Sequence, residues 1–90
     1  MRSVEAWKRE KLKDPAFKKE YDALESEFAL ARELIGARAK AKLSQAQVAR
    51  RMGTSQSAVA RMESGRTLPS TTSLVKYAKA VGRELKVTLR

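Results

Sequence analysis

Hydrophobic residues recur every three or four positions along most of this chain, which is the spacing of helices that bury one face. A short helix is predicted over residues 4–11, and Asp14 and Pro15 then supply a cap and a first residue for a second helix. An apolar stripe follows on one face of this second helix, formed by Phe17, Tyr21, Leu24 and Phe28. The helix is expected to reach about residue 41, with a possible interruption at Ser26.

The middle of the chain predicts shorter helices separated by capping and stop signals. Ser44 and Gln47 have the spacing of a capping box, and Gly53 supplies the left-handed residue that ends such a helix. Two further helices are predicted over residues 56–64 and about 72–81, each followed by a glycine. Short helices joined by short turns indicate a mostly all-α fold.

The last residues change period, because Leu85, Val87 and Leu89 alternate with polar residues. Nothing else in the chain alternates in this way, and a lone strand cannot satisfy its backbone hydrogen bonds. We therefore expect two copies to pair these strands antiparallel across a two-fold axis, which makes a homodimer. The alternative is a frayed tail.

Composition excludes several classes of site. The chain has 90 residues, the size of one domain, and contains neither His nor Cys. Zinc fingers, Ser-His-Asp triads and Cys-His pairs are therefore excluded. The carboxylates have no metal-site spacing, so we predict no enzyme activity, no cofactor and no metal. No apolar run approaches the roughly 20 residues that span a bilayer, so a cytoplasmic, nucleoid-associated protein with no membrane partner is expected.

Charge points to nucleic acid as a partner. The chain holds 20 Lys and Arg against 10 Asp and Glu, a net charge of +10. Residues 1–40 contain ten basic and eight acidic residues, whereas residues 41–90 contain ten and two. A basic excess confined to one half is typical of a surface that neutralises phosphates, although it also keeps any protein soluble.

Residues 45–62 have the features of a helix-turn-helix. Ala49 provides a small residue where two helices cross, and Gly53 can take a positive φ in the turn. The second helix of this motif enters the major groove of double-stranded DNA. Its outward positions carry side chains that can read base edges, namely Gln56, Ser57, Ala60 and Arg61. Phosphate contacts are expected from Gln45, Thr54, Ser55 and Arg66.

Residues 28–82 resemble the Xre/Cro/phage-repressor family, most closely in the stretch LSQAQVARRMGTSQSAVARMESGRTLPS. The resemblance implies a five-helix, lambda-repressor-like domain that binds an operator as a dimer. By position it assigns a phosphate contact to Gln45 and base reading to Gln56, Ser57 and Arg61. Glu63 matches a position that supports the fold of that family.

Nearly the whole chain is similar to HigA-type antitoxins of toxin–antitoxin pairs. The similarity is carried by the Trp-containing N-terminal helix, by DPAFKKEYDALESEFALARELIGARAKAKLSQ, and by the terminal LKVTLR, which also resembles HipB-type antitoxins. It implies that the protein neutralises a RelE/HigB-like ribonuclease toxin and represses its own operon. Three parts are expected: a helical extension over 1–26, the helix-turn-helix domain over 27–82 and a dimerisation strand over 83–90.

The extension is the expected toxin-binding surface, because the first third of the chain holds four of the five aromatic residues, three of them in the extension, and large aromatics dominate interfaces. The candidate toxin contacts are Trp7, Phe17, Tyr21 and Leu24. The same stripe could instead pack onto the repressor core, and the acidic residues around it could face a basic toxin or only solvent. A stand-alone phage-type repressor, or an adaptor that does not read DNA, remain alternative functions.

Overall fold

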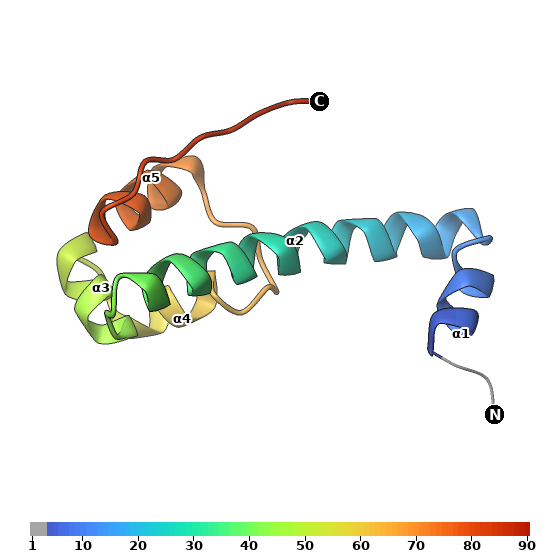
Figure 1. Cartoon of the computed structure of the whole chain (residues 1–90), viewed down its shortest axis with the longest axis horizontal. Coiled ribbons are helices and arrows are strands. Elements are labelled where there is room, and N and C mark those ends of the chain that lie inside the picture. The colour runs from blue at the N-terminus through green and yellow to red at the C-terminus, as the bar shows by residue number, and fades with distance from the viewer. Residues whose placement is uncertain (1–3) are drawn as a thin grey trace.

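Five helices account for the regular structure of residues 4–90, the part of the chain that the computed structural model describes (Figure 1). They are α1 (Val4–Lys11), α2 (Pro15–Lys40), α3 (Gln45–Met52), α4 (Gln56–Met62) and α5 (Thr71–Ala80). The C-terminal half of α2 packs with α3, α4 and α5, while its N-terminal half projects away from them and meets α1 at its far end (Figure 1). The prediction of a mostly helical fold is confirmed.

Local capping explains where most of these helices begin and end. Asp14 accepts a hydrogen bond from the Ala16 N–H at 3.0 Å and so caps α2. Ser44 and Gln47 form both hydrogen bonds of the predicted capping box, at 3.1 and 2.8 Å. Gly53 ends α3 in the left-handed conformation with φ of 69°. These ends are set by neighbouring residues, which is why the sequence predicts them.

Ser26 does not interrupt α2, which runs without a break over 26 residues. The Ser26 hydroxyl donates to the carbonyl oxygen of Asp22 at 3.1 Å, one helical turn earlier. The hydroxyl thus shares the carbonyl that the Ser26 N–H uses in the helix, an arrangement that is satisfied within the helix and does not end it. The expected boundary between residues 26 and 27 consequently lies inside one continuous helix.

The hydrophobic core lies between α2, α3, α4 and α5 and receives nothing from α1. Val48, Val59 and Tyr77 are its fully buried large side chains. Around them lie the other buried members of the cluster, Leu34, Ala49, Met62, Ala80 and Val81. α1 contributes no buried residue, so the extension is not part of this core.

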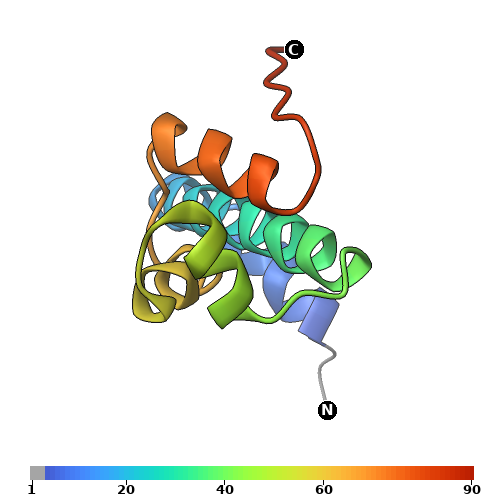
Figure 2. The same cartoon turned by 90° about the vertical axis from the view of Figure 1, so that its left-hand side faces the viewer.

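Two details of the expected fold differ from the structure. Residues 27–82 contain four helices and not five, because α1 of the extension is among the five found in residues 4–90. Residues 83–90 contain no strand and leave the helical body after α5 (Figure 2). A single chain offers them no neighbouring strand, and Val87 and Leu89 are 73% and 93% exposed. Strand pairing across a dimer stays a prediction.

Candidate nucleic-acid interface

The turn between α3 and α4 has the geometry that a helix-turn-helix requires. The Thr54 N–H donates to the carbonyl oxygen of Ala49 at 2.9 Å, which closes the turn after Gly53. Ser55 caps α4 by accepting a hydrogen bond from the Ala58 N–H at 3.1 Å. The two helices are held together by buried side chains, with Val48 and Ala49 on α3 and Val59 on α4. α4 is therefore fixed against α3 on one face only.

The opposite face of α4 carries the predicted base-reading residues. Gln56, Ser57 and Arg61 are exposed, and Ala60 is half-buried. Val59 and Met62 are buried on the inner face of the same helix. The structure thus brings the predicted base-reading residues together on one accessible surface of a short helix.

A hollow of about 310 Å³ lies beside this surface, between α4 and the start of α5. Two predicted DNA contacts, Thr54 and Arg61, line it together with Lys76 from α5. Lys76 is absent from the sequence-based candidates, because only the packing of α5 against the motif reveals that it lines the same hollow as Arg61. The one signal that the sequence offers is a basic residue within the helix predicted over residues 72–81. Arg66, in the loop after α4, is also exposed.

A buried polar network joins α2, α3 and α5 at the end of α4. Arg38 donates from Nε and Nη2 to the two carboxylate oxygens of Glu63, each at 2.8 Å, in a bidentate pair. Its Nη1 also donates to the carbonyl oxygen of Leu43 at 3.1 Å. The Tyr77 hydroxyl oxygen lies 2.7 Å from Glu63 Oε2 and 2.8 Å from the carbonyl oxygen of Leu34. Together with a hydrogen bond from Gln45 at the start of α3, these contacts tie α2, α3 and α5 to the carboxylate of Glu63, which follows α4.

This network keeps Glu63 ionised. Burial by itself would raise the pKa of Glu63, but hydrogen bonds from Arg38, Tyr77 and Gln45 outweigh it and hold that pKa below its ordinary value. Burial, and then the hydrogen bond to Glu63, raise the pKa of the Tyr77 phenol. The hydrogen bond to Glu63 raises the pKa of Arg38. At neutral pH the cluster is therefore an ion pair with a neutral phenol donor.

Gln45, a predicted phosphate contact, is also bonded to the buried network. Its Nε2 donates to Glu63 Oε1 at 3.1 Å, so the side-chain amide is held at the N-terminus of α3 by the buried network. The side chain is half-buried, and its second N–H and its carbonyl oxygen are the groups that a phosphate or a phosphate-bound water can meet. The expected phosphate contact at Gln45 remains a prediction, now with a defined orientation for the amide.

The aromatic residues of the extension pack on one another and not on the core. The rings of Trp7 and Phe17 meet edge to face with centroids 6.0 Å apart, and Phe17 stacks on Tyr21 at 6.2 Å. Lys8 Nζ lies 4.8 Å from the centre of the Tyr21 ring, and a hydrogen bond to Tyr21 raises the pKa of Lys8. These contacts fasten α1 to the beginning of α2. Trp7 and Leu24 are nevertheless each 49% exposed.

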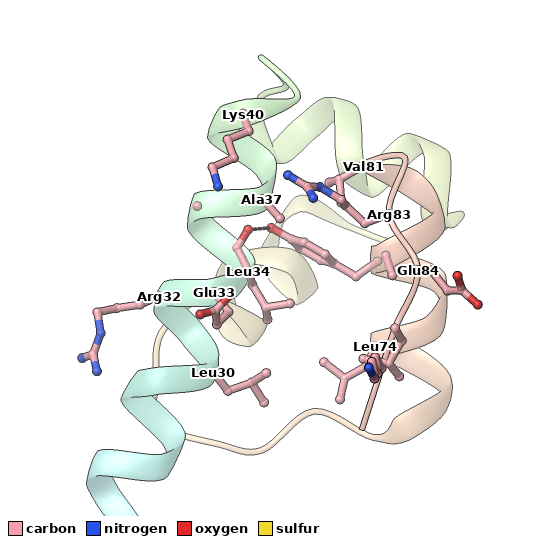
Figure 3. A pocket seen from close by; sticks show the side chains of 15 residues that line it. Leu30, Arg32, Glu33, Leu34, Ala37, Lys40, Leu74, Val81, Arg83 and Glu84 are labelled. Atoms are coloured by element: carbon pink, nitrogen blue, oxygen red, sulfur yellow. Dashed lines mark hydrogen bonds between the residues drawn. The ribbon is translucent and has the colours of Figure 1, made fainter. Parts of the chain in front are cut away.

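A second, larger groove of about 650 Å³ separates α2 from α5 and the tail (Figure 3). Leu30, Leu34, Ala37, Leu74 and Val81 form an apolar floor, and charged residues of α2 and the tail surround it. Leu85 lines the same groove and is half-buried. The first of the three apolar tail residues is therefore already seated beside α2 and α5, unlike Val87 and Leu89.

Comparison with known protein families identifies the family of this chain. A model of the helix-turn-helix family matches residues 34–87. The chain belongs to the helix-turn-helix family. The match covers the C-terminal part of α2, the motif itself and α5, and it confirms the resemblance expected from the sequence. The family is one of DNA-binding regulators and not of enzymes.

Antitoxin HigA1 from two strains of Mycobacterium tuberculosis is similar to this chain, with 36% identity over 76 residues. The similarity covers 84% of this chain and 51% of each relative, so the chain spans about half the length of the curated relatives it matches. The expected resemblance to HigA-type antitoxins is thereby confirmed. No solved structure matches. Within residues 4–90 no helix is long and apolar enough to cross a membrane.

Proposed function

We propose that this protein is a repressor-antitoxin, which binds operator DNA as a homodimer and neutralises a RelE/HigB-like ribonuclease toxin in the cytoplasm. The observation that carries the proposal is the extent of the similarity to Antitoxin HigA1. It covers 76 residues, 84% of this chain, whereas residues 27–90 number only 64, so at least 12 residues of the extension take part in it. A stand-alone helix-turn-helix regulator would share only the DNA-binding part with an antitoxin.

DNA binding is assigned to the exposed face of α4. Gln56 is suited to a bidentate contact with adenine, Arg61 to a fork onto guanine, Ser57 to either base and Ala60 to a thymine methyl. Thr54, Ser55, Gln45 and Arg66 surround this face as phosphate contacts. Lys76 joins them, because it shares the hollow beside α4 with Thr54 and Arg61.

Dimerisation is assigned to the tail. Two recognition helices must lie about one helical turn of DNA apart to bind two half-sites, which a single chain cannot provide. Pairing of Leu85, Val87 and Leu89 with their copies would satisfy the backbone groups of the tail and shield its two exposed apolar side chains.

Toxin binding is assigned to the extension formed by α1 and the N-terminal half of α2. Trp7, Phe17 and Tyr21 form one cluster there, outside the core of the helix-turn-helix part. The exposed halves of Trp7 and Leu24 leave apolar surface for a protein partner.

The antitoxin activity is tested by bacterial growth during expression of the small reading frame next to this gene. Growth should stop without this protein and resume with it. The Trp7→Ala variant should restore growth poorly, whereas Arg61→Ala, on the DNA-binding face, should restore it fully. A neighbour that is harmless, or one whose effect this protein does not relieve, would favour the stand-alone repressor.

The DNA-binding assignment is tested with the segment upstream of the gene and a scrambled duplex of the same length. Arg61→Ala should cost about 1–3 kcal/mol on the upstream segment and little on the scrambled one. Arg66→Ala should weaken both to a similar degree and reduce the dependence of affinity on salt. Lys18→Ala, an exposed cation of the extension, is the matched control and should change neither. Equal losses on both duplexes for Arg61→Ala would make that residue a phosphate contact.

A further inference from the structure

α2 carries an apolar stripe on a face that the core does not cover. Leu24, Phe28 and Ile35 are 49%, 42% and 40% exposed. Their separations of four and seven residues place them on one side of the helix. The stripe begins in the extension and continues beside the helix-turn-helix part, so it connects two regions that have separate roles in the proposed function. Ala31, between Phe28 and Ile35 on the same side, is itself buried, and three large half-exposed apolar side chains on one helix face mark an interaction site.

The charges beside the stripe are mainly negative, although the chain as a whole has a net charge of +10. Helical spacing places Glu20 and Glu27 along one edge of the stripe and Glu25 with Arg32 along the other. Arg32 is paired with Glu25 at 3.3 Å, and Glu25 also interacts with Lys8 of α1, which lies over the Tyr21 ring. The excess negative charge beside the stripe is therefore that of Glu20 and Glu27. This face would repel phosphates and attract Lys and Arg, so its partner is a basic protein surface and not nucleic acid.

Phe28 also touches the loop that follows α4. Gly65 is buried and has φ of 74°, and a side chain built at Gly65 would overlap the Phe28 ring, with Cε1 only 2.8 Å from its Cβ. Gly65 lies between Glu63 of the buried network and Arg66, the predicted phosphate contact. One edge of the Phe28 ring is therefore exposed in the stripe while the ring covers the backbone of the DNA-binding loop.

We propose that Leu24, Phe28 and Ile35 form the docking surface for a basic protein partner, and that Phe28 transmits occupancy of this surface to the loop of residues 63–66. A partner that covers the exposed edge of Phe28 confines the ring against Gly65 and holds the loop in its DNA-binding conformation. The loop then loses less conformational freedom when DNA binds, so partner and DNA strengthen each other's affinity reciprocally. The proposal rests on the proposed function in taking the neighbouring toxin as the partner.

The docking surface is tested by the affinity of the protein for the product of the adjacent reading frame. Leu24→Lys and Ile35→Lys should each weaken this binding about tenfold or more, because each removes apolar surface and adds a charge of the partner's own sign. Ala29→Lys is the matched control, since Ala29 is exposed on the other side of α2, and it should have little effect. Lys is a good helix former, and circular dichroism verifies the fold of each variant.

The coupling is tested by the affinity for the upstream DNA segment with and without the same partner. The partner should raise the DNA affinity of the natural chain about fivefold or more. Phe28→Leu keeps an apolar side chain in the stripe but loses most of the ring that covers Gly65. This variant should still bind the partner, while the gain in DNA affinity disappears. Without any partner, its backbone amides over residues 63–66 should exchange hydrogen faster.

The outcomes separate this inference from the function on which it rests. If the neighbouring protein binds the natural chain but Leu24→Lys and Ile35→Lys bind it equally well, the antitoxin function stands and the docking surface is refuted. If Phe28→Leu retains the full gain in DNA affinity, the coupling is refuted. If the neighbouring protein does not bind at all, the proposed function and the docking surface both fail. Hydrogen exchange of Phe28→Leu still decides whether the ring orders the loop.

Discussion

Replacing Glu63 with Gln tests whether the buried network holds the helix-turn-helix part together. The Glu63 side chain is 3% exposed and the Arg38 side chain 20%. Gln has nearly the same size as Glu, so Glu63→Gln removes the charge while leaving the packing in place. The Arg38 guanidinium then stays largely buried without a counter-charge.

The expected loss of stability follows from this burial. Breaking a buried ion pair by removing one partner costs about 3–5 kcal/mol, far more than the net contribution of the intact pair. The side-chain oxygen of Gln can still accept two of the four hydrogen bonds that Glu63 accepts, so the lower end, about 3 kcal/mol, is expected. For a chain of this size each kcal/mol lowers the melting temperature by roughly 4–8 °C, so a decrease of about 12–24 °C is predicted.

Thermal unfolding followed by far-ultraviolet circular dichroism measures the effect. Glu25→Gln is the matched control, because Glu25 pairs with Arg32 at 3.3 Å on the surface, where the two side chains are 53% and 64% exposed. Such a pair contributes at most about 1 kcal/mol. Combining Glu63→Gln with Arg38→Met should recover part of the loss, since the unpaired charge is then absent. Equal melting temperatures for Glu63→Gln and Glu25→Gln would refute the reasoning.

Three further predictions concern pH, backbone conformation and the tail. The pKa of Glu63 is lower in the folded chain than its ordinary value of 4.5, so the unfolded chain binds more protons as the pH falls. The stability from this group is therefore present above about pH 4.5 and is lost on acidification through the folded pKa; urea unfolding should show a smaller acid loss for Glu63→Gln. Gly53→Ala should cost about 1–2 kcal/mol from its positive φ alone, because its Cβ would meet nothing within 4 Å. Gly65→Ala should cost more, because the new Cβ also displaces Phe28, and a Phe28→Ala background should reduce the difference in urea unfolding. Deleting Leu85–Arg90 should leave a folded monomer with weakened binding to the upstream DNA segment, and a truncated chain that stays dimeric by light scattering would contradict the assignment of the tail.

Much of the candidate site follows from local signals. The ends of α3 are specified by Ser44, Gln47 and Gly53, which act within a few residues of themselves. The exposed side of α4 follows from burial of Val59 and Met62 at a spacing of three. These features need no distant partner, so the position of the helix-turn-helix and its outward residues can be predicted from sequence alone.

The remaining features depend on residues that meet only after folding. Glu63 lies 25 positions from Arg38 and 14 from Tyr77. No local sequence pattern therefore predicts the buried network or the hydrogen bond from Gln45 to Glu63. Lys76 and Arg61 likewise come to line one hollow, and Phe28 comes to cover Gly65, only in the folded chain.

By itself, the sequence determined the helical class, most helix ends, the position of the motif and the separation of aromatic from basic residues along the chain. Each of these depends on spacing and capping between near neighbours. The tertiary structure decided that α2 runs unbroken from the extension into the core, that the extension packs on itself, and that one carboxylate ties four segments together. In the single chain, residues 83–90 form no strand despite their alternating pattern. The reason is physical: a helix satisfies its backbone internally and can be specified locally, whereas an ion pair, a ring contact or a strand needs a partner that only the folded chain or a second copy supplies.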